Sequence, residues 1–425
     1  MLKAYDILMR VARRLAMTVA PAESRRPGGE TMRYLRGQRH AVEAVRKGMK
    51  GIDRSRPTVW LHAASLGEFG IARPIISQLR KAVDCNIVVT FFSPTGYEAV
   101  SRNRGDIDRV FYLPFDTRDN AEAFLDAVQP ACAVFMVSEY WHNYLSLLAE
   151  RGVPTLLVSA IIRNDGPFFR PVYGKLYRDS LHTFSRVFTL DENSVENIKR
   201  LGLVNGEVSG DPLFDNVSLV AATPWRDEVV ERFKGRERIF LAGSIHNDED
   251  LEMITELANR HPHTRFIIVP HEISEPTMRA IEERVNGGCM RRSQCSTSTC
   301  FDNVQALIID SVGSLAYLYR YATWAYVGGG FTKLLHSVIE PAVYGIPVAF
   351  GPNIRRKVTP REMIELGIGH KVEDTDDLDL WFKGLKGNEN RLKYIAKRAA
   401  AYVSRNCGST ARVVDEITRL ICEKK

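Results

Sequence analysis

The feature that most constrains the fold is a regular alternation of short apolar segments with longer helical patterns from residue 57 onward. Each apolar segment has the length of a strand, and this alternation is the signature of parallel βαβ units. A first series comprises residues 58–63, 86–91, 109–113, 131–137, 155–159 and 186–190, and a second comprises residues 238–242, 265–269, 306–309, 324–327 and 347–350. We therefore expect an α/β protein with two Rossmann-like lobes and a cleft between them.

A chain of 425 residues is too long for one hydrophobic core, so several domains are expected. The first series ends near Ser209, and the stretch from Gly210 to Arg226 has the composition of an interdomain linker. We predict an N-terminal arm over residues 1–56, a first Rossmann-like domain over residues 57–212 and a second over residues 213–425.

Positive charge is concentrated in the arm. Residues 1–56 hold 14 Lys and Arg against 5 Asp and Glu, whereas the whole chain has a net charge of only +7, so the remainder is nearly neutral. Apolar residues recur at helical spacing near the N-terminus, and basic residues occupy the rest of the helical wheel. The apolar positions are Tyr5, Leu8, Val11, Ala12, Leu15 and Val19. The pattern predicts a basic amphipathic helix.

This helix favours attachment to an anionic cytoplasmic membrane leaflet. The arm has no run of the roughly 18 apolar residues that span a bilayer, and arginines interrupt any signal-peptide core. There are two alternatives: the helix packs on the rest of the protein, or the arm binds nucleic acid. The second is weakened because no aromatic residues are interleaved for base stacking.

The seven cysteines point to a reducing compartment, because their number is odd and no signal peptide precedes them. Cys289, Cys295 and Cys300 lie in a polar stretch at spacings that match no familiar zinc pattern. We interpret them as free loop thiols.

Ligands of parallel sheets bind at the carboxyl ends of the strands, so the loops after those strands are the candidate sites. In the first loop, Ser65 and Glu68 are spaced as a capping box, in which each side chain satisfies a backbone donor at a helix start. The functional alternative is that Glu68 acts as a general base for a sugar hydroxyl.

Two later loops of the first domain carry side chains suited to a sugar. Glu139 and Trp141 follow the apolar segment 131–137, and a carboxylate beside an indole can bind hydroxyl groups and stack on a sugar ring. Arg163 follows the next segment and can pair with a carboxylate or phosphate. It can equally be solvated surface charge.

In the second domain, Gly243 and Ser244 open a helix rich in acid, where backbone amides and the Ser244 hydroxyl can hold a phosphate. Ser244 or Asn247 is equally suited to be a plain N-cap. His271 ends the next strand and can contact a phosphate or base, although a lone histidine is more often structural. Asp310 precedes a further helix as either its N-cap or a pocket residue.

Three successive glycines, Gly328 to Gly330, follow the apolar segment 324–327 and let the backbone approach a ligand closely. If residues 335–344 are helical, His336 and Glu340 share one face near the helix N-terminus. That position suits an anion, and the carboxylate can accept hydrogen bonds from a ribose diol. The alternative is an ordinary βαβ crossover.

Taken in order, these loops resemble the 3-deoxy-D-manno-octulosonate (Kdo) transferase family of lipopolysaccharide synthesis. The resemblance runs from the arm to the last helix. It rests on His62-Ala-Ala-Ser-x-Gly-Glu68, Glu139-x-Trp141-x-Asn143, Gly243-Ser-x-His246, Pro270, Asp310-x-x-Gly313-x-Leu315 and Gly328-Gly-x₆-His336-x₃-Glu340-Pro-Ala-x₂-Gly-x-Pro347. No single motif is diagnostic, whereas the set in this order is.

The resemblance implies the GT-B glycosyltransferase fold and an inverting transfer of Kdo from CMP-Kdo to a lipid A precursor, lipid IVA, on the cytoplasmic side of the inner membrane. It implies Glu68 as the catalytic base, no metal or other cofactor, and no nucleic-acid partner. The first domain would bind the acceptor through Ser65, Glu139, Trp141 and Arg163. The second would bind the donor through Gly243, Ser244, His246, His271, Asp310, Gly313, Gly328, Gly329, His336, Ser337 and Glu340.

Three positions depart from the commonest family pattern. Ser337 stands in place of an asparagine, Ile245 in place of a threonine, and the arginine often found between Pro270 and His271 is missing. The alternatives are therefore another GT-B enzyme with a different nucleotide-sugar donor, or a catalytically inactive membrane scaffold that binds glycolipid. The sequence leaves open the number of Kdo units, the acceptor hydroxyl and the oligomeric state.

Overall fold

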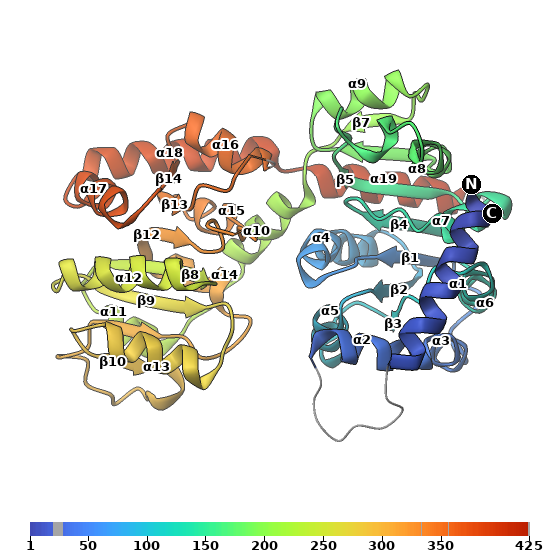
Figure 1. Ribbon diagram of the computed structural model, residues 1–425. Coiled ribbons are helices and arrows are strands. Elements are labelled where there is room, and N and C mark those ends of the chain that lie inside the picture. Colours follow the sequence, from blue (N-terminus) through green and yellow to red (C-terminus); the bar gives the residue numbers. More distant parts are fainter. Residues whose placement is uncertain (20–28, 333, 356, 424–425) are drawn as a thin grey trace. The chain divides into compact units, whose positions relative to one another are not determined.

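The computed structural model describes residues 1–19, 29–332, 334–355 and 357–423 (Figure 1). Part of the predicted arm, residues 20–28, therefore lies outside the described residues, as does the side chain of Val19. The chain divides into two compact units, Met1–Asn216 with Asn406–Lys425, and Val217–Arg405. Each is built on its own seven-stranded parallel sheet, which confirms the predicted α/β class.

The sheet of the first unit has the strand order β3-β2-β1-β4-β5-β6-β7. Its strands are β1 (Thr58–His62), β2 (Asn86–Phe91), β3 (Arg109–Tyr112), β4 (Cys132–Met136), β5 (Thr155–Ala160), β6 (Arg186–Thr189) and β7 (Gly206–Val208). Its helices are α1 (Leu2–Val19), α2 (Glu30–Arg39), α3 (Ala41–Gly48), α4 (Leu66–Ala82), α5 (Pro94–Arg102), α6 (Arg118–Val128), α7 (His142–Glu150), η1 (Pro167–Phe169), α8 (Gly174–Leu181), α9 (Glu192–Arg200) and α19 (Ser409–Cys422).

Successive residues of a strand point to opposite faces of this sheet, so each face has its own core. Leu61 packs with Leu79 of α4 and Ile417 of α19, whereas its neighbour Trp60 packs with Phe124 of α6 on the other face. Burial on both faces explains why the strand sequences are almost continuously apolar.

The sheet of the second unit has the order β10-β11-β9-β8-β12-β13-β14. Its strands are β8 (Ile239–Ile245), β9 (Arg265–Pro270), β10 (Cys289–Arg291), β11 (Ala306–Ile308), β12 (Ala322–Val327), β13 (Val348–Phe350) and β14 (Gly369–Lys371). Its helices are α11 (Glu228–Lys234), α12 (Asp248–Arg260), α13 (Glu275–Arg284), η2 (Arg292–Gln294), α14 (Leu315–Leu318), η3 (Tyr319–Tyr321), α15 (Ile339–Ala342), α16 (Val358–Glu365), α17 (Thr375–Leu385) and α18 (Glu389–Asn406). Cys289 is thus part of a strand, which corrects its interpretation as a loop thiol.

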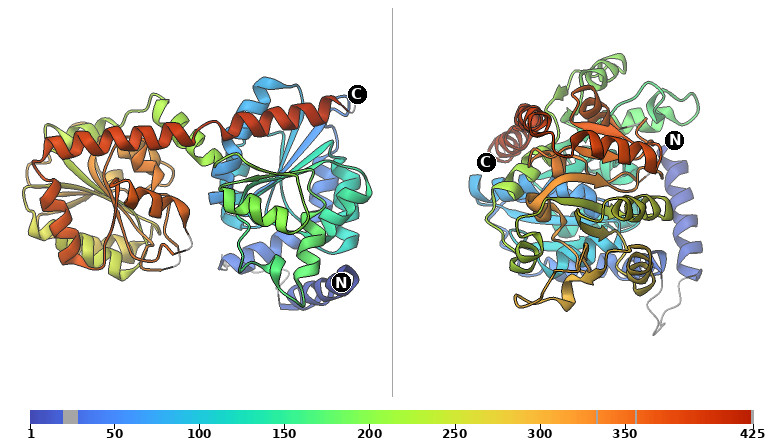
Figure 2. Two further views of the ribbon diagram at one scale, coloured as in Figure 1. Left: turned by 90° about the horizontal axis from the view of Figure 1, so that it is seen from above. Right: turned by 90° about the vertical axis from the view of Figure 1, so that its left-hand side faces the viewer.

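The domain limits also need correction. The predicted domain 213–425 includes the last helix, α19, yet α19 packs on the first unit, where Val413 and Ile417 join the core beside α4 (Figures 1 and 2). The predicted linker is a helix, α10 (Pro212–Ala222), that begins in the first unit and ends in the second. Its Asp215 accepts hydrogen bonds from the backbone N–H groups of Gly408 and Thr410, which holds the start of α19.

Helix α1 packs on the first unit through a polar face. The Tyr5 hydroxyl donates a hydrogen bond of 2.8 Å to the buried carboxylate of Asp116, and Asp6 accepts one from the backbone N–H of Arg118. The opposite face is apolar and exposed, with Leu8 and Leu15 each more than 60% accessible. Tyr5 therefore does not belong to the exposed apolar face on which the sequence pattern placed it. Among the described residues, no helix combines the length and the hydropathy that a membrane span requires.

Candidate functional site

The strand orders identify where ligands should bind. In the first sheet the order reverses between β1 and β4, and in the second between β8 and β12. The carboxyl ends of strands at such a reversal flank a crevice in open α/β sheets. Glu68 and Glu139 follow β1 and β4, whereas His246 and Gly328 follow β8 and β12. Glu68 and Glu139 therefore lie at one switch point, and His246 and Gly328 lie at the other.

Glu68 lies in the first turn of α4, and the capping box is formed. Ser65 accepts a hydrogen bond from the backbone N–H of Glu68, while the Glu68 carboxylate accepts one from the backbone N–H of Ala64. Burial and, after it, the negative charge of Glu139 raise the pKa of Glu68 to about 7. The side chain thus caps a helix and is also poised to exchange a proton near neutral pH.

Glu139 is held beside this carboxyl group by the ring of Trp141 and lies close to the ring of His62. The Trp141 indole donates a hydrogen bond of 2.7 Å to Glu139 Oε2, and His62 Nε2 lies 3.6 Å from the same oxygen. The rings of His62 and Trp141 meet edge to face. Trp141 therefore orients the carboxylate, a role different from the sugar stacking that the sequence suggested for it.

His62 is fully buried, and sequence reasoning did not select it as a site residue. Its Nδ1 lies 2.9 Å from the Thr90 hydroxyl, which also accepts a hydrogen bond from the Trp60 indole. Because the hydroxyl then has its own proton to donate to Nδ1, a neutral His62 carries its proton on Nε2, facing Glu139. These contacts among the buried side chains of His62, Thr90 and Trp60 fix the orientation of the imidazole at its Nδ1 side.

Arg163 lies on the loop after β5, one strand beyond the switch point. It lines a cavity of about 370 Å³ together with Ser138, Tyr140, Phe168 and Tyr177. The aromatic rings of Tyr140, Phe168 and Tyr177 meet edge to face, which gives the cavity a rigid apolar wall. An arginine beside such a wall suits a ligand with an anionic group and an apolar or sugar surface.

Backbone strain concentrates at the carboxyl ends of these strands. Val137, Ser159 and Ser244 all adopt positive φ, between 55° and 61°, directly after β4 or within the last residues of β5 and β8. A β-branched residue such as Val137 rarely adopts this conformation, and such residues cluster at functional sites.

In the second unit, a carboxylate that the sequence analysis missed organises the site. Asp250 of α12 is fully buried and accepts hydrogen bonds from the backbone N–H groups of His246 and Gly329 and from the Tyr326 hydroxyl. It thereby ties the loop after β8 to the glycine turn after β12. The N-cap of α12 is Asn247, which leaves Ser244 without that role.

The glycines of this turn are required by packing within the protein. A Cβ on Gly328 would collide with the backbone oxygen of Ser244, and one on Gly329, whose φ is +83°, with that of Leu334. The sequence predicted that the backbone of this turn approaches a ligand closely. In the structure, the turn instead approaches neighbouring backbone closely.

Residues 335–344 do not form one helix, so the condition for a shared face of His336 and Glu340 is not met. The helix here, α15, spans only Ile339–Ala342, and His336 precedes it in a loop. The backbone N–H of His336 donates to the carbonyl of Gly328, so the chain folds back on the glycine turn before helical bonding starts. His336 and Glu340 therefore do not share a helical face. Burial raises the pKa of Glu340 to about 7.

Several buried polar atoms at this edge have no hydrogen-bond partner among the described residues. They are His246 Nδ1, His336 Nε2 and Ser337 Oγ. Because an unsatisfied buried polar group costs about 1–3 kcal/mol, such a concentration marks a surface built to bind a polar ligand. His271 lies beside this group, with its ring centroid 4.8 Å from that of His246.

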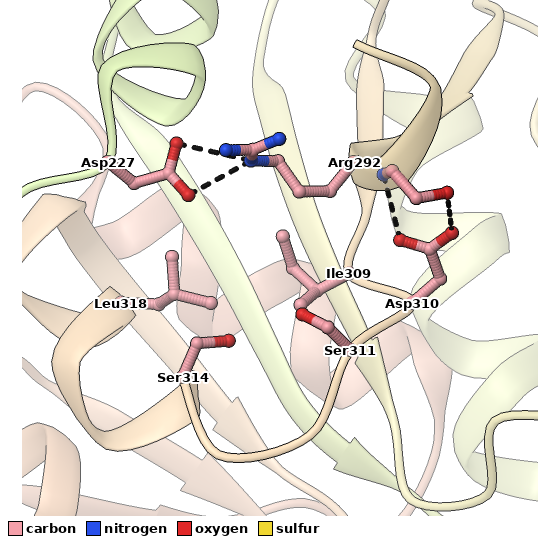
Figure 3. Close-up of a pocket in the computed structure, with 8 residues that line it drawn as sticks. Asp227, Arg292, Ile309, Asp310, Ser311, Ser314 and Leu318 are labelled. Carbon is pink, nitrogen blue, oxygen red and sulfur yellow. Dashed lines mark hydrogen bonds and ion pairs between the residues drawn. The ribbon is translucent and has the colours of Figure 1, made fainter. Parts of the chain in front are cut away.

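Asp310 and Ser314 line a different cavity, of about 270 Å³ (Figure 3). Asp310 accepts hydrogen bonds from the backbone and side chain of Ser293, and the cavity is closed on another side by the ion pair between Arg292 and Asp227. Asp310 is thus a pocket residue and not an N-cap. Gly313, with φ of +96°, makes the turn into α14.

Comparisons with known proteins agree with this arrangement. Residues 37–216 match the family described as 3-deoxy-D-manno-octulosonic-acid transferase (kdotransferase). A 3-deoxy-D-manno-octulosonic acid transferase of Bordetella pertussis is 25% identical over 398 residues, which cover 90% of this chain and 92% of that protein. A bifunctional glycosyltransferase/methyltransferase of Fusobacterium nucleatum is 24% identical over 344 residues, which cover 78% of this chain and 53% of the relative, so the chain spans about half of that protein.

Solved structures support the fold. A UDP-GlcNAc 2-epimerase from Neisseria meningitidis, solved bound to UDP-GlcNAc, superposes with a TM-score of 0.56 at 14% identity, covering 82% of this chain and 99% of that one. A likeness at this identity establishes the fold alone, and it agrees with the predicted GT-B fold class, in which each unit is Rossmann-like.

Proposed function

Because the chain belongs to the 3-deoxy-D-manno-octulosonic-acid (Kdo) transferase family and is a glycosyltransferase, we propose that it transfers Kdo from CMP-Kdo to a lipid A precursor, lipid IVA, with Glu68 as the general base. The observation that carries the proposal is the position of Glu68 at the switch point of the first sheet with a pKa of about 7. A base with such a pKa takes up and releases protons readily at physiological pH.

In the proposed step, Glu68 removes the proton from an acceptor hydroxyl, and the oxygen attacks the anomeric carbon of Kdo. The bond between that carbon and the phosphate oxygen breaks, its electron pair leaves with CMP, and the configuration inverts. Attack from the face opposite the leaving group requires no covalent intermediate, so one carboxylate suffices as base. Glu139 assists by keeping the pKa of Glu68 near neutrality.

The first unit supplies the acceptor side of the proposal. Ser65 fixes the start of α4, Glu139 and Trp141 border the reacting hydroxyl, and Arg163 attracts an anionic group of the acceptor into its cavity. The positive charge of Arg163 also offsets the repulsion between two anionic substrates.

The second unit supplies the donor side. The unpartnered His246, His336 and Ser337 atoms, with the backbone of Gly243 and Ser244, receive the phosphate and carboxylate of CMP-Kdo. Glu340 accepts hydrogen bonds from the ribose diol, since no described residue is hydrogen-bonded to its carboxylate. The cavity beside Asp310 and Gly313 receives the cytosine. His271 and the turn at Gly328 and Gly329 complete this surface.

We expect transfer without a metal ion or other cofactor. The leaving group is a nucleoside monophosphate, so no diphosphate needs charge neutralisation by a divalent cation. Transfer that continues undiminished in a chelator supports this expectation, whereas activity that is lost in chelator and restored by Mg²⁺ contradicts it.

We further propose that α1 holds the protein on the anionic cytoplasmic face of the inner membrane, where the acceptor lies. The exposed apolar face with Leu8, Val11 and Leu15 can enter the acyl boundary while neighbouring Arg and Lys residues contact headgroups. Nucleic acid is not expected as a partner.

Nucleotide binding separates this proposal from a GT-B enzyme with another donor. Calorimetry with CMP, UDP and GDP should detect binding of CMP and much weaker binding of the other two. Preference for UDP or GDP would assign a different donor. Binding of CMP without any transfer to lipid A precursor would instead favour a catalytically inactive scaffold.

A further inference from the structure

Three histidines meet at the switch point of the second sheet. His246 follows β8, His271 follows β9, and His336 lies in the loop after β12. Because β9, β8 and β12 are neighbours in the sheet, their carboxyl ends bring the three imidazoles together. One nitrogen from each ring lies within 4.8 Å of the other two.

The ring nitrogens are available as ligands. His246 Nδ1 and His336 Nε2 are buried without a hydrogen-bond partner among the described residues, so no protein group competes for their lone pairs. A neutral imidazole binds a metal ion through such a lone pair.

The geometry points to a divalent transition-metal site formed by His246, His271 and His336, and we propose Zn²⁺ or Co²⁺ as its ion. Three neutral imidazoles suit these ions, whereas Mg²⁺ and Ca²⁺ prefer oxygen ligands. Metal–nitrogen bonds of about 2.0–2.1 Å in a tetrahedral site place ligand nitrogens roughly 3.4 Å apart. Side-chain rotation, for which the exposed His271 has the most freedom, closes the remaining gap.

The predicted site has three protein ligands, and at least one coordination position stays open, as in zinc sites that bind an exchangeable molecule. Its backbone supports are rigid. Asp250 holds the loop of His246, and the backbone N–H of His336 is bonded to Gly328. This inference goes beyond the proposed glycosyl transfer, which needs no metal. It uses the histidines of the proposed donor site, so a bound ion would compete with the phosphate and carboxylate of CMP-Kdo for His246 and His336.

Metal titration of the full-length protein tests the site. After treatment with chelator, Co²⁺ should bind with one ion per chain and give the visible absorption of nitrogen-ligated tetrahedral cobalt, and Zn²⁺ should displace it in calorimetry. His271→Ala and His336→Ala should each weaken binding by about 100-fold or more, since each removes one of three ligands. His263→Ala, an exposed histidine of the same unit, is the matched control and should bind normally.

The cysteines provide the competing explanation. A thiolate-to-cobalt charge-transfer band that survives in the triple variant H246A/H271A/H336A, and that disappears on thiol alkylation, would assign the ion to cysteine and overturn the proposal. So would the absence of Co²⁺ and Zn²⁺ binding by the wild type. CMP affinity of the wild type and of His263→Ala, measured in chelator, reports the donor site independently of the metal. Unchanged thermal unfolding of His271→Ala confirms that a loss of metal binding is not a loss of fold.

Discussion

Glu68 and Glu139 place two carboxyl groups at the switch point of one parallel sheet, and the charge of Glu139 adds to burial in raising the pKa of Glu68 to about 7. Glu139 is itself fixed by the Trp141 indole. The environment thus gives the two carboxyl groups different roles. Glu68 exchanges a proton near neutral pH, and Glu139 raises the pKa of Glu68.

The pH dependence of transfer should follow this pair. If Glu68 is the base, kcat/KM rises with pH and levels off above about 7, because only the deprotonated carboxylate accepts the hydroxyl proton. Glu139→Gln removes a negative charge, so the pKa of Glu68 should fall and the inflection should move to lower pH. An inflection that is unchanged in this variant would show that Glu139 does not tune the base.

The contact between Glu340 and ribose can be tested with two nucleotides. Glu340→Gln should weaken CMP binding about 10- to 100-fold at pH 8, where the wild-type carboxylate is ionised, because a charge-assisted hydrogen bond is lost. The variant should also discriminate less between CMP and 2′-deoxy-CMP than the wild type does. Glu365→Gln, an exposed glutamate of the same unit, serves as control. Equal discrimination by wild type and variant would remove Glu340 from the ribose.

Asp250 should be a major source of stability in the second unit. Asp250→Ala leaves two backbone N–H groups and the Tyr326 hydroxyl without their acceptor, each at a cost of about 1–3 kcal/mol. We expect a fall of more than 3 kcal/mol in the free energy of unfolding, measured in urea, and a loss of CMP binding. Asp248→Ala, in the same helix turn but exposed, should change stability by less than about 1 kcal/mol.

The membrane proposal depends on the exposed face of α1. Leu8→Glu/Leu15→Glu should reduce binding to vesicles that contain phosphatidylglycerol by at least about 10-fold, because two apolar anchors are lost and two negative charges are added. Leu380→Glu changes an equally exposed leucine of α17 and should leave sedimentation with vesicles unchanged. An equal loss of vesicle binding in both variants, or no loss in either, would contradict a specific role for α1.

The sequence predicted the fold well because burial on both faces of a parallel sheet leaves continuous apolar segments. It could not place α19, since the amphipathic pattern of a helix does not say on which sheet it packs. Glu68 was selected because it follows a strand end, whereas its capping-box spacing predicted the helix start that the structure has. Asp250 was missed because its partner Gly329 lies 79 positions away and nothing local signals their contact.

The interpretation of the glycine turn shows the same limit. Spacing alone suggested that His336 and Glu340 share one helix. In the structure, the backbone N–H of His336 donates a hydrogen bond to the carbonyl of Gly328, so His336 lies in the loop before the helix. The three histidines come from strands that are adjacent in space and distant in the sequence, so their proximity emerges only from the strand order.

The most direct test of the proposed function is product formation from lipid IVA and CMP-Kdo, generated in situ, by wild-type protein, Glu68→Gln and the exposed control Glu196→Gln, read by mass spectrometry. We predict that wild type and Glu196→Gln add one or more Kdo units, whereas Glu68→Gln is slower by roughly 100- to 10,000-fold yet binds CMP normally. Equal rates for Glu68→Gln and wild type, or no Kdo addition by wild type that binds CMP, would contradict it.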